Sequence, residues 1–316
     1  MTTTFRHQFF NILQTALLLG AIGTIGWLVL SSLFSGIVAA FAVVGIGIAA
    51  VVGPGWSAAS MLRSYGARQL GEREFPEANA MLAHLANQAA LPAAPKLYYL
   101  PSAAPNAFAT GSIDDSVVCV SDGLLRLLNR REFFGVLAHE VTHIANRDLW
   151  IMGLADVMSR AVSLASYVGQ FILLLNLPLL LIGALTVPWI VPLMLIFAPT
   201  VISLLQLALS RSREFDADLG AAKLTGDPLG LASALAKLER RSGRFWEDIF
   251  LPSRRMPDPS LLRTHPPTED RISRLKELAA RLQTTISGDQ DRRVQIPPRL
   301  APVTRKPRLR WTGAWY

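Results

Sequence analysis

The run His139-Glu140-Val141-Thr142-His143 has the residue types and spacing in this sequence that are best suited to chemistry. Because an α-helix has about 3.6 residues per turn, side chains four positions apart lie on the same face, roughly one turn apart. Two imidazoles at that separation can share one tetrahedral Zn²⁺ ion, at about 2.0–2.1 Å each. Glu140 lies beside them without being a ligand, which suits a general base that removes a proton from an attacking water. The run therefore predicts one Zn²⁺ per chain and a hydrolytic reaction.

The residues around this run predict the helix that the chemistry requires. At 100° per residue, the histidines project from one side of the helix and a set of apolar residues from the other. The apolar set is Phe134, Leu137, Val141 and Ile144. Asn129, followed three residues later by Glu132, has the pattern of a capping box at the start of a helix. A polar helix face that carries two histidines by chance is the alternative, because the five-residue pattern alone is only moderately specific.

A third metal ligand is expected downstream, where Glu214 and Asp218 are again one helical turn apart. Glu214 would complete a site of two histidines and one glutamate. Asp218 would accept a hydrogen bond from the far ring nitrogen of a ligating histidine and so fix its tautomer. The alternative is a solvated helix face that also includes Arg211 and Arg213, but the upstream histidine pair favours the ligand interpretation.

Four segments, in this order, resemble the HtpX-like family of membrane zinc metalloproteases, which are relatives of the CAAX prenyl proteases. They are residues 105–111, 138–148, 210–228 and 264–267, and the resemblance covers roughly residues 60–285. It implies a four-span membrane endopeptidase whose zinc site lies at the cytoplasmic face and which acts in quality control of membrane proteins. The turn at residues 112–116 departs from the family, being shorter and more acidic than the usual basic turn, and the last 30 residues match nothing in it.

The resemblance also implies roles for three further residues. His265, with Arg271, is implied as a donor of hydrogen bonds to the oxyanion that forms during cleavage. His265 could equally be a structural histidine before the two prolines that follow it. Asn106 and its neighbours resemble the family's edge strand beside the active site, which would bind substrate as an added strand.

Two long tracts without Asp, Glu, Lys or Arg, residues 8–62 and 161–210, predict membrane spans. One spanning helix needs about 20 apolar residues, so each tract fits two helices, and we expect four spans arranged as two hairpins. The first hairpin should turn at residues 31–36, and the second at residues 176–178 or near Pro188 and Pro192. A secretory signal peptide at residues 8–30 is disfavoured, because a second apolar stretch follows at once.

Basic residues predict the orientation of these spans. They flank the outer ends of the hairpins and are missing from both tips. The flanking residues are Arg6, Arg63, Arg68, Arg130, Arg131, Arg147, Arg211 and Arg213. By the positive-inside rule, both termini and the hydrophilic segments face the cytoplasm. Together with this orientation, the resemblance implies a multi-pass protein of the cell inner membrane whose catalytic domain lies on the cytoplasmic side.

The net charge of +8 does not indicate a nucleic-acid partner. Membrane flanks and a basic C-terminal segment account for it, and the sequence contains no recognised nucleic-acid module. The single cysteine, Cys119, excludes an internal disulfide framework. Because it lies in the apolar run of residues 117–120, we expect it in a core strand rather than in a nucleophilic role.

We expect five segments. Residues 1–62 and 150–210 form the two membrane hairpins, and residues 63–149 and 211–286 form the two halves of one catalytic domain, since each half supplies part of the ligand set. The first half should contain helices at residues 76–90 and 123–128 and strands at residues 96–100, 106–109 and 117–120. Residues 287–316, rich in Pro and Arg, are expected to be a disordered basic tail, either lying on an anionic membrane surface or simply solvated.

The predicted fold class is therefore a membrane α-helical protein of four spans with a mainly α, α+β zincin-type metalloprotease domain that carries a small sheet. The predicted function is zinc-dependent cleavage of peptide bonds in cytoplasmic segments of misfolded or damaged membrane proteins, with the lipid bilayer as its other partner. A prenyl-peptide protease is one alternative, although it would need a large chamber for which four spans are too few. A zinc-binding membrane scaffold without turnover is the other. A channel would usually need polar groups inside its spans.

Overall fold

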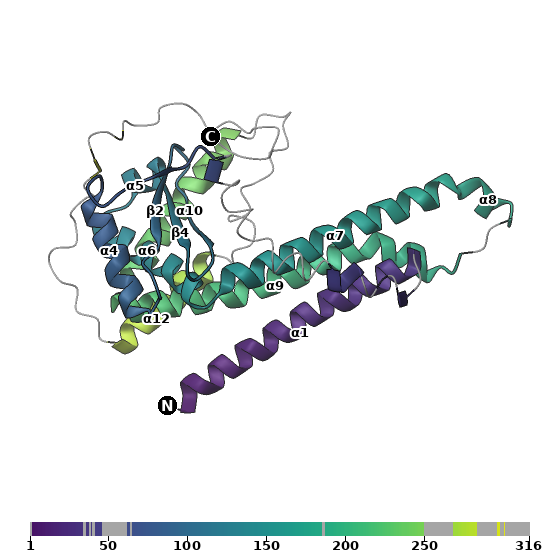
Figure 1. The fold of residues 1–316 in the computed structure, drawn as a ribbon, viewed down its shortest axis with the longest axis horizontal. Helices are drawn as coiled ribbons and strands as arrows, with labels where there is room; N and C mark the ends of the chain where they lie inside the picture. Colours follow the sequence, from purple (N-terminus) through teal and green to yellow (C-terminus); the bar gives the residue numbers. More distant parts are fainter. Residues whose placement is uncertain are drawn as a thin grey trace. The chain divides into compact units, whose positions relative to one another are not determined.

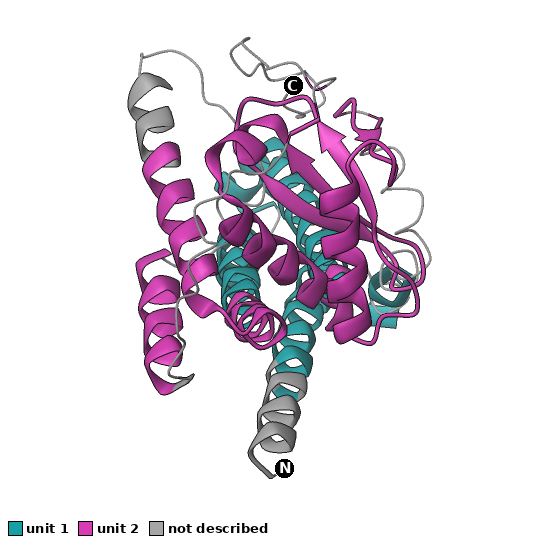
Figure 2. Ribbon diagram, turned by 90° about the vertical axis from the view of Figure 1, so that its left-hand side faces the viewer, with its two compact units in different colours: residues 1–54, 150–212 teal, residues 55–149, 213–316 magenta. Residues whose placement is uncertain are grey.

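The computed structural model describes residues 2–33, 36–37, 39, 42–45, 62–63, 65–184, 187–249, 268–282, 296–297 and 300. The chain divides into two compact units, drawn in different colours in Figure 2. Unit 1 comprises Met1–Pro54 and Trp150–Ser212, and unit 2 comprises Gly55–Leu149 and Arg213–Tyr316. Three expectations lie wholly or mostly outside the described residues: the second span of the first hairpin, the position of His265, and most of residues 287–316.

Long apolar helices dominate unit 1 (Figure 1). They are α1 (Thr2–Leu33), α7 (Asp148–Leu175), the short α8 (Leu177–Leu181) and α9 (Ile190–Thr225), and the two ends of the α7–α9 segment belong to unit 2. Three stretches of the described chain, Thr15–Ser32, Asp148–Leu175 and Ile190–Thr225, are long and apolar enough to cross a membrane. Three of the four expected spans are thus present, and the fourth falls on residues that are mostly not described.

The described residues of the first hairpin agree with a reversal inside the expected residues 31–36, after both serines. Ser31 and Ser32 are still helical, and their hydroxyls donate to carbonyls three residues earlier, at 2.9 and 2.7 Å, so the helix itself satisfies them. The indole of Trp27 donates to the carbonyl of Gly36 at 3.2 Å. Nine residues of continuous helix would separate these positions by about 13 Å. Trp27 and Gly36 therefore lie on opposite sides of a chain reversal that follows Leu33, within the expected range, and residues 34–35 are not described.

The second hairpin reverses between the end of α7 and the start of α9, over residues 176–189, of which residues 185–186 are not described. Both expected turn positions border this stretch, because Asn176 directly follows α7 and Pro188 lies just before α9. Pro192 falls in the first turn of α9, where a missing backbone N–H leaves no helical hydrogen bond unmade.

A side chain of α7 compensates for a proline inside α9. Pro199 has no N–H to donate to the carbonyl of Leu195, four residues earlier. The amide of Gln170 donates to that carbonyl at 2.7 Å. In an apolar environment an unsatisfied carbonyl costs several kcal/mol, because water is not there to bond it. Gln170 therefore removes the penalty of the proline and joins the two helices.

Unit 2 contains a small mixed sheet with strand order β1-β2-β4-β3. The strands are β1 (Arg68–Gln69), β2 (Lys96–Leu100), β3 (Ala107–Gly111) and β4 (Ser116–Ser121). The central pair, β2 and β4, is parallel, and the two outer pairs are antiparallel. The three strands expected from sequence are present within two residues of their predicted ends, and β1 is additional. The sheet leaves β3 at one edge.

Helices cover one face of this sheet, and the chain before β1 packs on the other. The helices of unit 2 are α4 (Pro76–Gln88), α5 (Asp122–Leu127), α6 (Arg130–Ala145), α10 (Pro228–Ile249) and α12 (Thr268–Leu282), besides the ends of α7 and α9. The main core joins Leu97 and Val118 of the sheet to α4, α6, α10 and α12. Cys119 faces the second cluster with Phe108 and Tyr65. Burial, and secondarily the nearby Glu140, raises the pKa of its thiol to about 12, which agrees with a core role.

The start of α6 joins the two halves of the catalytic sequence. The expected capping box is present: Asn129 accepts from the backbone N–H of Glu132, and the Glu132 carboxylate accepts from the N–H of Asn129, both at 2.9 Å. The same buried carboxylate accepts from Ser233 at 2.6 Å and Lys237 at 2.7 Å, both on α10. One glutamate therefore caps the helix of the histidine pair and holds the downstream half against it.

Three residues of the C-terminal segment are described and two of them pack on unit 2, while the expected disorder of residues 287–316 as a whole stays a prediction. Leu300 is only 6% exposed and belongs to the main core, and Ile296 packs against that core. The carbonyl of Leu300 also accepts from the guanidinium of Arg126 at 2.9 Å. These contacts tie Ile296 and Leu300 to unit 2.

The partnership of Gln170 and Pro199 predicts a non-additive effect on stability. Gln170→Leu should lower the free energy of unfolding by about 1–3 kcal/mol, because the carbonyl of Leu195 loses its donor. With Pro199→Ala present, residue 199 can donate to that carbonyl and the same change should cost little. Titration of the protein in mild micelles with a denaturing detergent measures both costs, and Asn176→Leu, whose amide bonds only within its own helix end, is the control. Equal costs in the two backgrounds would contradict the pairing.

Candidate metal centre

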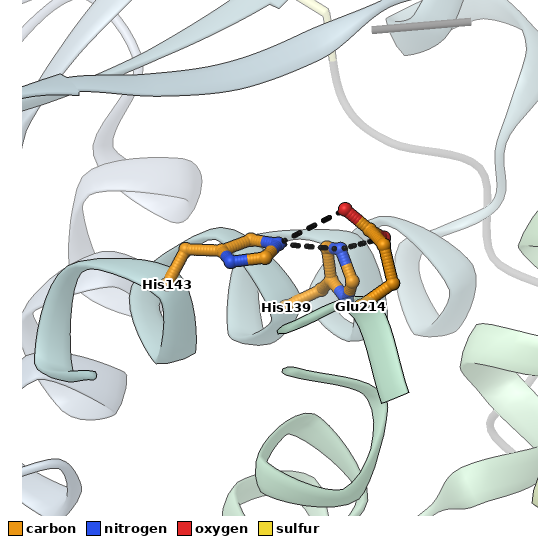
Figure 3. A group of neighbouring side chains, drawn as sticks. All are labelled: His139, His143 and Glu214. Atoms are coloured by element: carbon orange, nitrogen blue, oxygen red, sulfur yellow. Dashed lines mark hydrogen bonds and ion pairs between the residues drawn. The ribbon is translucent and has the colours of Figure 1, made fainter. Parts of the chain in front are cut away.

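Three side chains that are distant in sequence converge in unit 2: His139 and His143 from α6 and Glu214 from α9. One ligand atom from each lies within 4.8 Å of the other two. The two Nε2 atoms are 3.1 Å apart, and Glu214 approaches them at 3.3 and 3.6 Å. Figure 3 shows both imidazoles and the carboxylate pointing toward one another. The helical spacing and the downstream glutamate that the sequence singles out are thus brought together.

The far side of each imidazole contacts a different carboxylate. Nδ1 of His139 lies 3.1 Å from Asp218, and Nδ1 of His143 lies 3.0 Å from Asp148. Because an ionised carboxylate only accepts hydrogen bonds, each of these contacts favours a neutral tautomer in which Nδ1 carries the proton and Nε2 presents a lone pair. Lone pairs facing each other at 3.1 Å repel unless a cation lies between them.

The donor set fits a zinc ion. Two ligands of a tetrahedral ion at about 2.0–2.1 Å lie roughly 3.3–3.4 Å apart, close to the separations found between His139, His143 and Glu214. Imidazole nitrogen and carboxylate oxygen are ligands that zinc accepts, and three of them with one remaining position are typical of hydrolytic sites. The carboxylates on the far ring nitrogens are the outer partners that such histidines usually have.

Electrostatics favour positive charge at this site. Burial by itself would lower the pKa of both histidines. The carboxylates around them outweigh burial, so the pKa of His139 lies above its ordinary value and that of His143 well above it. Asp218 and Glu214 act on His139, and Asp148 and Glu214 on His143. Protons and a metal ion therefore compete for the same nitrogens.

Arg271 on α12 is brought to this cluster and holds its carboxylates. Its guanidinium makes two bonds to Asp218, at 2.6 and 2.7 Å, and lies 3.0 Å from Glu214. The side chain is almost fully buried. Nearby, the guanidinium of Arg274 lies 3.7 Å from the ring centre of Phe215, which holds α12 against α9. The contacts of Arg271 thus favour positioning of the ligand carboxylates, and the contact with substrate expected from sequence stays a prediction.

The remaining expected residues have different placements. Glu140 is buried on α6, next to His139, and its charge helps to raise the pKa of His143. Asn106 directly precedes the edge strand β3, and its backbone exchanges two bonds with Ser121, at 2.8 and 2.9 Å. His265 lies outside the described residues.

Sequence reasoning missed Asp148 and Arg213 as members of the site. Asp148 is 1% exposed, and Arg213 donates to it at 3.2 Å. Asp148 follows His143 by five residues, a spacing that faces away on a regular helix, so helical periodicity gives no signal for it. The sequence suggests that Arg213 is a membrane-flanking residue or part of a solvated helix face, whereas its side chain is buried, with the residue 8% exposed.

Comparisons with known proteins agree with this site. The family profile of Peptidase family M48 matches residues 72–279. The "Protease HtpX homolog" of Thermococcus kodakarensis is 41% identical over 237 residues, covering 69% of this chain and 79% of that protein. The "Protease HtpX homolog" of Kineococcus radiotolerans is 36% identical over 305 residues, covering 86% of this chain and 98% of that protein. Among solved structures, S. mikatae Ste24p matches with a TM-score of 0.43 and 19% identity, over 85% of this chain and 66% of that one.

The contacts of Arg271 predict a large loss of stability when its charge is removed. In the metal-free protein, Arg271→Gln leaves two buried carboxylates without their cation and should lower the free energy of unfolding by about 3–5 kcal/mol. Arg68→Gln is the matched control, because it breaks the half-exposed pair with Glu74 and should cost at most about 1 kcal/mol. Urea unfolding in mild micelles gives both values, and similar losses in the two variants would contradict the assignment.

Proposed function

Because the chain belongs to peptidase family M48, we propose that His139, His143 and Glu214 hold a catalytic Zn²⁺ ion and that the protein cleaves internal peptide bonds of membrane proteins. The convergence of three ligand atoms within 4.8 Å, from segments about 70 residues apart, is the observation that carries this proposal. Its family and its relatives make the chain a membrane metalloprotease. The proposal adds the identity of the metal, the roles of single residues and the substrates.

The residues of α6 can perform the proton transfers of peptide hydrolysis. A zinc ion bound at the site supplies Lewis acidity, which makes water a nucleophile near neutral pH. The carboxylate of Glu140 accepts the proton of the attacking water and passes it to the leaving amine nitrogen. His265 is proposed, from the resemblance of its segment to the family, to donate to the oxyanion. Asp218 and Arg271 hold His139 and Glu214 in place.

The edge strand β3 is the proposed binding place for substrate. It pairs with β4 on one side only, and it packs beside α6, the helix of the histidine pair. An extended peptide can therefore add to β3 through backbone hydrogen bonds and pass close to the metal ligands. Asn106, at the start of this strand, would contact the peptide at one end of the added strand.

The chain path supports membrane proteins as substrates, with cleavage in their cytoplasmic segments. The third ligand, Glu214, lies on α9, and Asp148, which contacts His143, is the first residue of α7. Both helices contain candidate spans, so the site is covalently close to the bilayer. Basic flanks support the cytoplasmic side. These features favour removal of misfolded or damaged membrane proteins over prenyl-peptide cleavage, for which a chamber of more spans would be needed.

A general base at Glu140 predicts loss of cleavage without loss of metal. Glu140→Gln keeps the size of the side chain but cannot accept a proton, so turnover of a model membrane substrate should fall by at least about 100-fold. Zinc content should stay at one ion per chain, whereas Glu214→Ala should lose both zinc and activity. Glu277→Gln, an exposed glutamate on α12, is the control. Normal turnover in Glu140→Gln would contradict this role of Glu140 and indicate a different general base.

The proposed orientation predicts which side of the membrane single cysteines face. Thr186→Cys, in the sequence between α8 and α9, should react with an impermeant maleimide added to the periplasmic side, and Asp289→Cys should not. The native Cys119 gives little background, because it is buried and the pKa of its thiol is raised to about 12. Labelling of Asp289→Cys from outside in intact cells would place the catalytic unit on the opposite side.

A further inference from the structure

The second histidine of the metal centre has a carboxylate partner of its own. Asp148 Oδ2 lies 3.0 Å from Nδ1 of His143, and Asp148 is 1% exposed. Its other oxygen accepts from Nη1 of Arg213 at 3.2 Å. The arrangement repeats that around His139, where Asp218 contacts Nδ1 and Arg271 binds Asp218. Each imidazole therefore contacts a carboxylate, and that carboxylate in turn contacts an arginine.

The turn that brings Asp148 to His143 is conformationally unfavourable. In an uninterrupted helix, a residue five positions after His143 would be rotated by about 140° and would face away from it. Instead, α6 ends at Ala145, and Arg147 adopts a left-handed conformation with φ of 59° before α7 begins at Asp148. A residue other than glycine in this region costs about 1 kcal/mol. The unfavourable conformation of Arg147 is thus part of the turn that brings the Asp148 carboxylate to Nδ1 of His143.

The contact between Asp148 and Arg213 also joins two segments that are far apart in the sequence. Residues 150–212 leave unit 2 as an inserted segment, and Asp148 and Arg213 lie within two residues of its two ends. Their contact joins the ends of the insertion at the metal centre. The orientation of His143 thus depends on a contact that both ends of the inserted segment must make together.

We propose that Asp148, held by Arg213, is a positioning residue that fixes the ring orientation and tautomer of His143 for metal binding. This inference rests on the proposed metal site. The competing explanation is structural: Asp148 is an acidic residue in the first turn of α7, where it would favour the helix N-terminus, and it neutralises a buried arginine. The two explanations differ in what happens when both charges are removed together.

The test measures zinc affinity of the full-length protein in detergent micelles, by competition with a chelator. Asp148→Asn should weaken zinc binding by about 10–100-fold, as Asp218→Asn should on the other histidine. The double variant Asp148→Asn/Arg213→Gln removes both charges of this ion pair together, so it avoids leaving a buried arginine without Asp148 and gives a second measurement if the single variant does not fold. It should bind zinc as weakly as Asp148→Asn, because the neutral amide still cannot replace the carboxylate at His143.

A structural role predicts a different result, namely that the double variant recovers affinity within about threefold of the original. Such recovery, or unchanged affinity in a folded Asp148→Asn variant, would overturn the inference. The absorption spectrum of the Co²⁺-substituted double variant is a second readout: a shift of the visible bands supports an altered His143 ligand, and an unchanged spectrum contradicts it. Asp156→Asn is the matched control, since it breaks an exposed pair with Arg160 on the same helix.

The same measurements separate this inference from the proposed function. A protein that binds no zinc before any substitution, or a Glu214→Ala variant that binds it normally, would contradict the metal site itself. Zinc binding that depends on Glu214 but not on Asp148 would contradict only the positioning role.

Discussion

The charge balance of a buried polar cluster is the constraint on which the rest of unit 2 depends. Four buried carboxylates, those of Glu140, Asp148, Glu214 and Asp218, surround the histidine pair, and isolated charges there would be very costly. Two arginines, each buried and each bound to a carboxylate, offset part of that cost. The two Nε2 atoms and the Glu214 carboxylate face one another, and a cation would be stabilised at the point between them.

The charged residues of this cluster lie on four helices, so the charges balance only where these helices meet. The histidines come from α6, Glu214 and Asp218 from α9, Asp148 from the start of α7, and Arg271 from α12. The fold fixes their relative places by contacts elsewhere, such as the shared carboxylate of Glu132 between α6 and α10. Packing in the main core then makes the convergence rigid.

The parts of the site that sequence predicts are those with helical periodicity. The histidine pair, the glutamate with its aspartate one turn later, and the capping box each repeat at three or four residues, and the structure contains all three. Asp148 escaped notice because a turn with positive φ, not a helix, sets its direction. Arg213 looked like surface because one sequence cannot show which helix face a distant element covers. Similarly, Ser31 and Ser32 do not narrow the position of the first turn within residues 31–36, since serine hydroxyls can bond within a helix as well as end one.

The two units solve one physical problem in related ways. A group that its own helix cannot satisfy is satisfied by a side chain from another segment: Gln170 of α7 bonds the carbonyl that Pro199 leaves unpaired in α9, and Arg213 of α9 bonds the carboxylate of Asp148 at the start of α7. In both cases α7 and α9 exchange a polar contact, once within the apolar part of the hairpin and once beside the metal ligands. Because hydrogen bonds in apolar surroundings are strongly directional and costly to lose, these contacts restrict the helices' relative rotation more than apolar packing alone would. Each contact restrains α7 against α9 where it lies, and the one between Asp148 and Arg213 also restrains the approach of Asp148 to His143.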